Sequence, residues 1–110
     1  MPKAPGKWSP GRATQEINKC AKSDSLSVSW KLHAKEQMRE RGIIMGDVLH
    51  VLKRGFVYSE PINASRPGYH KYLVEATTPN SDGRAVGVVV IPDDVACELK
   101  IITVMWRDES

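Results

Sequence analysis

The stretch YHKYLVEATTPNSDGRAVGVVVI, residues 69–91, decides the fold. Residues 69–76 alternate in character and are rich in Tyr and Val, and residues 84–91 are strongly β-branched, so both predict strands. Between them, residues 78–83 (TPNSDG) concentrate the residue types that form turns. The segment therefore predicts a β-hairpin, with residues 84–91 as the central strand of an antiparallel sheet.

Two further strands are expected on either side of this hairpin. Toward the C-terminus, a turn at residues 92–94 leads into a last strand over residues 97–106. Toward the N-terminus, a short strand over residues 56–60 precedes a loop over residues 61–68. Strict alternation places four side chains of the last strand on one face: Leu99, Ile101, Thr103 and Met105.

The first half of the chain has helical periodicity, and we expect helices at residues 13–22, 29–41 and 45–54. A brief extended segment around Leu26 and Val28 leads into the second helix. Ser29 is its expected N-cap. The buried stripe of the second helix is expected at Trp30, Ala34 and Met38, and that of the third at Val48, Val51 and Leu52.

A chain of 110 residues, 41% hydrophobic and 26% charged, fits one globular domain. We place that domain at residues 13–107, between a disordered basic tail at residues 1–12 and a C-terminal tail at residues 108–110. The expected fold class is α+β, with two to three N-terminal helices packed on a four-stranded antiparallel sheet.

Composition also excludes several classes of protein. No apolar run approaches the ~20 residues of a membrane helix, and the N-terminus lacks the apolar segment of a signal peptide. Cys20 and Cys97 lie 77 positions apart, which gives neither a zinc-ligand spacing nor a disulfide framework. We therefore expect a cytoplasmic protein that has no metal, no cofactor and no membrane partner.

Charge is unevenly distributed along the chain. Residues 1–54 carry 11 Lys and Arg against 5 Asp and Glu, whereas residues 55–110 carry 5 against 8. This asymmetry suits an anionic partner such as RNA, DNA or an acidic protein, and it is equally compatible with basic helices that are simply solvated.

The segment most informative about function is HAKEQMRERGI, residues 33–43. At ~100° per residue, His33, Gln37 and Arg41 fall within about 80° of one another, directly beside the apolar stripe. Polar residues in that position lie where a helix meets a sheet, which is a common place for a cleft. A purely structural role for the histidine and the arginine stays open as the alternative.

This segment resembles a bacterial domain family of unknown function whose motif reads His-Ala-x-x-Arg-Met-x-x-Arg-Gly-Ile. The closing ITVMW, residues 102–106, resembles the Thr-Val-x-Trp ending of the same family. That family is similar to the superfold of RelE-like toxins, barnase, EndoU and colicin-type ribonucleases. The resemblance covers about residues 13–107. Gln37 stands where the family motif has Arg, and Ile44 stands where the family often has Ser or Thr.

The resemblance implies a toxin-like, metal-independent endoribonuclease of a toxin–antitoxin system. Such an enzyme needs a base for the 2′-hydroxyl proton, an acid for the leaving 5′-oxygen, and cations for the charged phosphorane. An imidazole and a bidentate guanidinium can fill these roles. The predicted catalytic residues are His33, Arg41 and Tyr72, and the predicted substrate-binding residues are Lys35, Gln37, Lys71 and Arg84.

The expected partners are mRNA or tRNA, either free or on the ribosome, and a cognate antitoxin protein. The alternative is a non-catalytic binding module or inhibitor that engages a cellular protein or nucleic acid through its basic N-terminal helices. The missing cation at Gln37 favours this alternative, in which surface residues such as Lys31, Lys35 and Arg39 would matter most. The free protein is expected to be a monomer or a weak dimer, the latter paired through an edge strand at residues 56–60.

Overall fold

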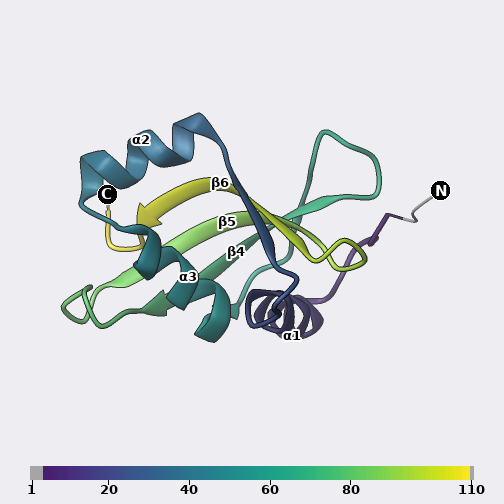
Figure 1. The fold of residues 1–110 in the computed structure, drawn as a ribbon, viewed down its shortest axis with the longest axis horizontal. Coiled ribbons are helices and arrows are strands. Elements are labelled where there is room, and N and C mark those ends of the chain that lie inside the picture. Colours follow the sequence, from purple (N-terminus) through teal and green to yellow (C-terminus); the bar gives the residue numbers. More distant parts are fainter. Residues whose placement is uncertain (1–3, 110) are drawn as a thin grey trace.

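The computed structural model describes residues 4–109. Its fold class is α+β, as predicted (Figure 1). The elements follow in the order α1 (Pro10–Ala21), β1 (Ser27–Trp30), α2 (Leu32–Arg41), α3 (Met45–Arg54), β2 (Phe56–Val57), β3 (Ile62–Asn63), β4 (His70–Thr77), β5 (Ala85–Asp93) and β6 (Glu98–Trp106). In this described part of the chain, no helix has the length and apolar character needed to span a membrane.

The strands form one six-stranded mixed sheet in the order β1-β6-β5-β4-β2, with β3 also paired to β4. The hairpin predicted from residues 69–91 is confirmed, because β4 and β5 pair antiparallel. β1 pairs parallel with β6, with Val28 opposite Leu99. The predicted four-stranded antiparallel sheet is therefore wrong in two respects, because the sheet has six strands and one of its pairings is parallel.

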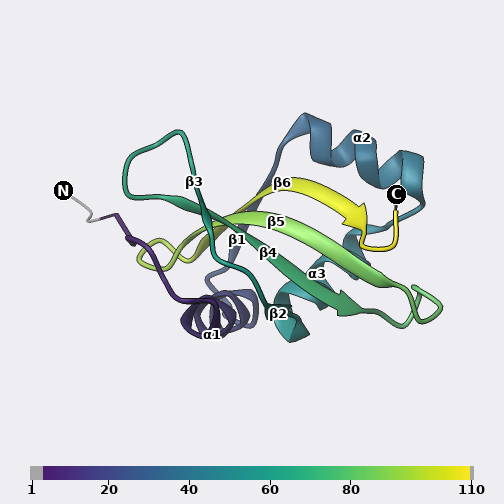
Figure 2. The same ribbon diagram turned by 180° about the vertical axis from the view of Figure 1, so that it is seen from behind.

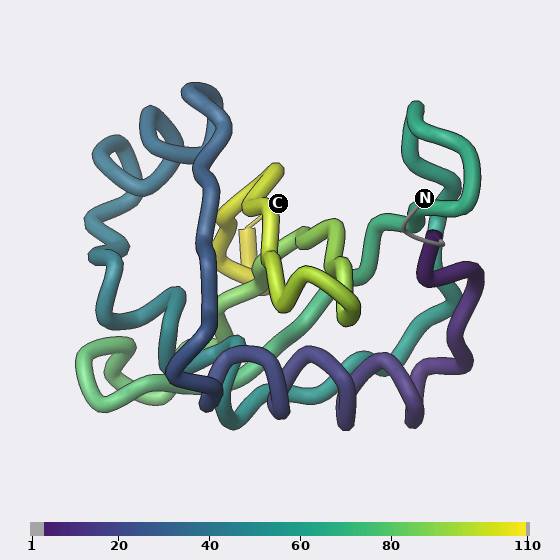
Figure 3. The backbone as a smooth tube through the Cα atoms, turned by 45° about the vertical axis from the view of Figure 1, so that its right-hand side comes forward, coloured from purple at the N-terminus to yellow at the C-terminus, as the bar shows by residue number. Residues whose placement is uncertain are grey.

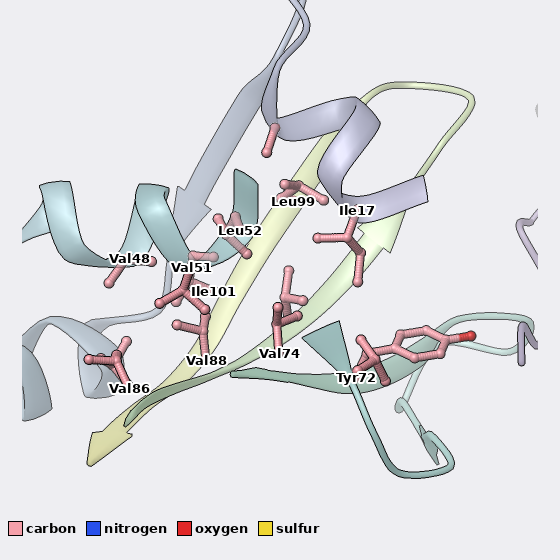
Figure 4. Packing of buried hydrophobic residues seen from close by; sticks show 14 of the residues in the cluster. Ile17, Val48, Val51, Leu52, Tyr72, Val74, Val86, Val88, Leu99 and Ile101 are labelled. Atoms are coloured by element: carbon pink, nitrogen blue, oxygen red, sulfur yellow. The ribbon is translucent and has the colours of Figure 1, made fainter. Parts of the chain in front are cut away.

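Helices α1 and α3 cover one face of this sheet, and the hydrophobic core lies between them and the strands (Figure 4). The prediction for the third helix is confirmed, since its expected apolar residues are all buried. Seen from behind, β4, β5 and β6 have no described helix in front of them (Figure 2). The largest fully buried side chains of the core include Ile17, Val48, Val51, Leu52, Val74, Val86, Val88, Leu99 and Ile101.

Helix α2 lies along the outer edge of β6 (Figure 1). β1 covers this edge only as far as Ile101, whose carbonyl accepts the Lys31 N–H at 3.0 Å. Beyond that point, the Gln37 side chain of α2 takes over, because its Oε1 accepts the Val104 N–H at 3.0 Å. The backbone hydrogen-bonding groups along this edge of β6 are thus paired first by a strand and then by a side chain from a helix.

Helix α2 begins later than the sequence predicts. Its N-cap is Lys31 and not Ser29, because Ser29 and Trp30 belong to β1, where they pair with β6. The expected N-cap preference of serine is overridden by a strand pairing that a local pattern cannot reveal. Two of the three predicted stripe residues are buried on α2 as expected, namely Ala34 and Met38.

Strand β6 does not keep the face that alternation predicts. Its register with β5 shifts by one residue, so that Ile101 lies opposite Val90 and Thr103 opposite Val89. Such a bulge moves the following side chains to the other face. Thr103 and Met105 therefore do not share the buried face of Leu99 and Ile101, contrary to the prediction. The buried residues of β6 are Leu99, Ile101 and Val104.

Residues 4–12 lie against the sheet, although the sequence predicts a disordered tail there. The Trp8 side chain is 2% exposed and stacks on Tyr72 with the ring centroids 5.7 Å apart. α1 already begins at Pro10. The buried indole supplies enough apolar contact to fix this segment, so the domain starts earlier than predicted. Residues 1–3 of the predicted tail lie outside the described residues.

Candidate functional site

The polar stripe predicted on α2 is present, and its first two members form a hydrogen-bonded chain to the sheet. His33 Nε2 lies 3.0 Å from Gln37 Nε2. Because Gln37 Oε1 is committed to the Val104 N–H, the Gln37 amide nitrogen is the donor toward His33. The neutral His33 ring therefore carries its proton on Nδ1. Gln37 has a structural role that an arginine could not fill, because a guanidinium has no acceptor.

Arg41 and Arg84 both contact Trp106 and belong to a cluster that we term the C-terminal clasp. Arg41 Nε donates to Glu109 Oε1 at 2.7 Å, and Arg84 donates to both oxygens of Asp108 at 2.8 and 2.7 Å. The Arg84 guanidinium lies 4.1 Å from the Trp106 ring centroid, and the Trp106 indole N–H donates to the Arg41 carbonyl. The predicted C-terminal tail thus pairs with two predicted site residues.

Tyr72 lies on the helix-covered face of the sheet (Figure 4). Its side chain is 1% exposed, its hydroxyl accepts the Trp8 N–H at 2.8 Å, and burial raises its pKa. Its neighbour Lys71 points to the opposite face, because side chains alternate along a strand. The structure therefore does not bring Tyr72 together with His33 and Arg41.

A hollow of about 400 Å³ opens on the uncovered face of the sheet, and we term it the basic groove. Its floor is built by β4, β5 and β6, including Ile91 and Ile102. Figure 3 shows these strands between α2 on one side and the loop before β4 on the other. Its polar lining consists of Lys31, Arg66, Tyr69, Lys71, Asp93, Glu98 and Lys100, with Ser65 at the margin.

Cations outnumber carboxylates in the basic groove. Asp93 is already engaged, because its oxygens accept the Tyr69 hydroxyl at 3.2 Å and the Ala96 N–H at 3.3 Å. Glu98 takes part in no ion pair within residues 4–109. Within residues 4–109, no ion pair engages any of the four cations, Lys31, Arg66, Lys71 and Lys100.

One wall of the groove is a stacked pair. The Arg66 guanidinium lies 4.4 Å from the Tyr69 ring centroid. Burial and the Asp93 carboxylate raise the pKa of Tyr69, so its hydroxyl stays protonated and donates to Asp93. The pair presents a planar cation to the hollow.

Of the predicted substrate-binding residues, only Lys71 lines the groove, whereas Lys35 is exposed on α2. Sequence reasoning missed Arg66 and Lys100. Lys100 carried a usable signal, since a lysine between the apolar Leu99 and Ile101 indicates a strand face open to water. Arg66 carried no such signal, because it lies in a loop, where no periodic pattern shows which way a side chain points. Among the residues that the structure describes, no group of three His, Cys, Asp or Glu side chains could hold a metal ion.

The fold and groove define an α+β domain whose sheet is covered by helices on one face and is hollow and basic on the other. The chain belongs to the family described as Domain of unknown function (DUF4258), which matches residues 30–106. This agrees with the expected domain family of unknown function. The matched region contains α2, α3 and every named residue of the basic groove, while α1 precedes it. No curated protein and no solved structure matches the chain.

Proposed function

We propose that this protein is a toxin-like, metal-independent endoribonuclease that binds its RNA substrate in the basic groove. The observation that carries the proposal is the set of groove cations that form no ion pair within residues 4–109: Lys31, Arg66, Lys71 and Lys100. A ribose–phosphate backbone is a regular row of anions that lysine and arginine bind. The motif at residues 33–43 resembles a domain family of unknown function that is itself similar to ribonuclease toxins, and this supports the same class of activity.

The groove also holds groups suited to acid–base cleavage. In metal-free cleavage, a base removes the 2′-hydroxyl proton, the 2′-oxygen attacks phosphorus, and an acid protonates the leaving 5′-oxygen. Glu98 is the proposed base, because its carboxylate lines the groove and forms no ion pair within residues 4–109. Lys71 and Lys100 stabilise the phosphorane, and one of their ammonium groups protonates the leaving oxygen. Arg66 offers a plane on which a base can stack.

The three catalytic residues predicted from the sequence differ in the part that they can take in the proposed reaction. His33 is exposed and lies two residues after Lys31 of the groove, so it remains a second candidate for the acid or base. Arg41 can bind phosphate only if Glu109 releases it. Tyr72 is buried on the other face and has no part in the proposed reaction.

The proposed substrates are mRNA or tRNA, free or on the ribosome, with a cognate antitoxin restraining the activity. The test maps RNA 5′ ends in bacterial cells shortly after induction, which also detects cutting that depends on the ribosome. We expect new ends with the wild type, none with the double variant Lys71→Met/Lys100→Met, and about 10²-fold fewer with Glu98→Gln.

The control is Lys19→Met, which makes the same substitution at one exposed position on α1. It should cut like the wild type. If the folded double variant cuts as efficiently as Lys19→Met, the groove is not the active site. Loss of cutting in His33→Ala alone would place the active site at the polar stripe of α2 and not in the groove.

The second candidate function is a binding module without chemistry. Its supporting observation is that the predicted catalytic side chains are engaged within the fold, Arg41 by Glu109, Tyr72 by Trp8 and His33 by Gln37. Growth arrest without new RNA ends would favour this function. Charge reversal at the exposed Lys35 and Arg39 should then abolish arrest, while Lys71→Met should not.

A further inference from the structure

Two thiols that are distant in the sequence meet in the structure. Cys20 lies near the C-terminal end of α1, and Cys97 lies in the turn between β5 and β6. The Cys97 thiol donates to the Cys20 carbonyl at 3.6 Å, which places it against the residue that carries the second thiol. Both are free cysteines. Their separation in the sequence gave no reason to pair them, because the contact depends on how α1 docks on the sheet.

The backbone around this thiol pair is held in place by the segment that links α1 to β1. The Cys20 carbonyl accepts the Ser23 N–H, and the Cys97 carbonyl accepts the Ser27 N–H, both at 3.1 Å. Cys97 has a φ of 50°, a left-handed conformation that non-glycine residues rarely adopt. The turn thus fixes the backbone from which the Cys97 thiol reaches α1. Figure 3 shows the β5–β6 turn beside α1.

We propose that Cys20 and Cys97 form a reversible intramolecular disulfide when the protein meets a low-molecular-weight disulfide such as oxidised glutathione. The two thiols differ in a way that sets the order of events. Cys20 is 6% exposed, whereas Cys97 is partly exposed. Burial and the contact with Cys97 raise the pKa of Cys20 to about 12. Cys97 is therefore the thiol that reacts first.

The reaction balances as two thiol–disulfide exchanges. The Cys97 thiolate attacks one sulfur of oxidised glutathione, the glutathione S–S bond breaks, and one glutathione leaves as a thiol. Cys20 then loses its proton and attacks the Cys97 sulfur, and the second glutathione leaves as a thiol. The two cysteines lose two electrons and two protons in total, and one molecule of oxidised glutathione is reduced. Excess reduced glutathione reverses both steps.

The disulfide would enclose α2, α3 and the hairpin in one covalent loop. Closing a long loop restricts the unfolded chain, which raises the thermal midpoint of unfolding. Disulfides in a reducing compartment are usually transient, so the bond is expected to respond to the glutathione potential and not to be permanent. This chemistry is independent of RNA cleavage.

In the test, the native full-length protein is equilibrated in glutathione buffers that range from reducing to oxidising. The exchange is then quenched with acid, the free thiols are alkylated, and the intact mass is measured. We expect two alkylations in reducing buffer and none in oxidising buffer, with the monomer lighter by two hydrogen atoms. The melting temperature should rise by about 10 °C on oxidation and return with reductant. Cys20→Ser and Cys97→Ser, which each keep one thiol, should show no such rise.

Three results would overturn the proposal. One is retention of two alkylatable thiols in the most oxidising buffer while the melting curve shows a folded protein. Another is a stable adduct of glutathione on Cys97 that Cys20 does not resolve. The third is disulfide bonds that join two chains, which non-reducing electrophoresis at low protein concentration distinguishes from a bond within one chain.

Discussion

Asp47 is a buried carboxylate that joins α3 to the hairpin turn. Its side chain is 3% exposed, Oδ1 accepts the Thr78 hydroxyl at 2.7 Å, and Oδ2 accepts the Ile44 N–H at 3.2 Å. Ile44 has no side chain that can cap the helix, so Asp47 satisfies the N–H at that end. The Asp47 carboxylate therefore holds the first turn of α3 and the hairpin turn together.

Replacing Thr78 by valine should destabilise the protein by about 1–3 kcal/mol, because it leaves a buried carboxylate oxygen without its donor. Urea unfolding measures the difference. The control is Thr77→Val, which makes the same change at the exposed end of β4. Equal unfolding midpoints for the two variants would mean that the Thr78 hydroxyl contributes nothing to stability.

The C-terminal clasp should loosen in acid. Hydrogen bonds from Arg84 and Arg41 lower the pKa of Asp108 and Glu109 from their usual values of 3.8 and 4.5. A lowered folded-state pKa means that the stabilising contact is complete above the usual value and is lost as pH falls through the lowered one. We expect the Trp106 indole N–H resonance to move below pH ~4, and not in Asp108→Asn/Glu109→Gln. The Trp8 resonance, remote from the clasp, should stay unchanged.

Gln37 shows how far a residue's role can be predicted. The helical wheel correctly placed it beside His33 on one stripe of α2. Its partner in the sheet could not be predicted, because a wheel gives the direction of a side chain and not the group that it meets. The partner is the Val104 N–H, which is free only because β1 ends at Trp30 and leaves the rest of the β6 edge open.

At the level of elements, the junction between α3 and β4 depends on a glycine. A Cβ at Gly55 would lie 2.5 Å from the Val51 carbonyl oxygen and 2.9 Å from the Glu75 carbonyl oxygen. Neither backbone atom can move freely, so Gly55→Ala should cost about 1–3 kcal/mol. Gly46→Ala is the contrasting variant, because its Cβ meets only Ile44 at 3.7 Å and helix α3 should gain about 0.5 kcal/mol. Thermal unfolding of both variants measures these opposite signs.

Elements with local signals were predicted well, and elements defined by distant partners were not. Helix α3 has the predicted bounds, because apolar periodicity and Gly55 lie within a few residues of it. The segment around Leu26 and Val28 was predicted only as extended, since its pairing partner β6 lies near the other end of the domain. The bulge in β6 likewise comes from its pairing with β5, and no residue in β6 predicts it.

On the scale of the whole molecule, the four cations of the basic groove predict how RNA binding depends on salt concentration. If RNA neutralises the four groove cations, the logarithm of the binding constant should fall with the logarithm of salt concentration with a slope of about −3. Lys71→Met/Lys100→Met should reduce the slope by about 1.4. Fluorescence anisotropy with a single-stranded 2′-O-methyl RNA, which resists cleavage, measures both slopes. An unchanged slope in the double variant would place RNA elsewhere on the protein.

The groove as a whole could not be predicted, although one of its residues was. Its cations come from the end of β1, the loop before β4, and strands β4 and β6. They converge because these strands lie between α2 and that loop (Figure 3). Composition indicated a basic first half of the chain, yet three of the four groove cations, Arg66, Lys71 and Lys100, belong to the acidic second half.

The position of β6 has a consequence for synthesis on the ribosome. β6 is translated after every other element of the domain, yet it lies inside the sheet, between β1 and β5. Until β6 leaves the exit tunnel, β1 has no strand to pair with, and the Gln37 side chain lacks the Val104 N–H that it accepts. The groove also lacks Lys100, which β6 contributes. The groove can therefore be completed only after β6 has emerged, in one late step.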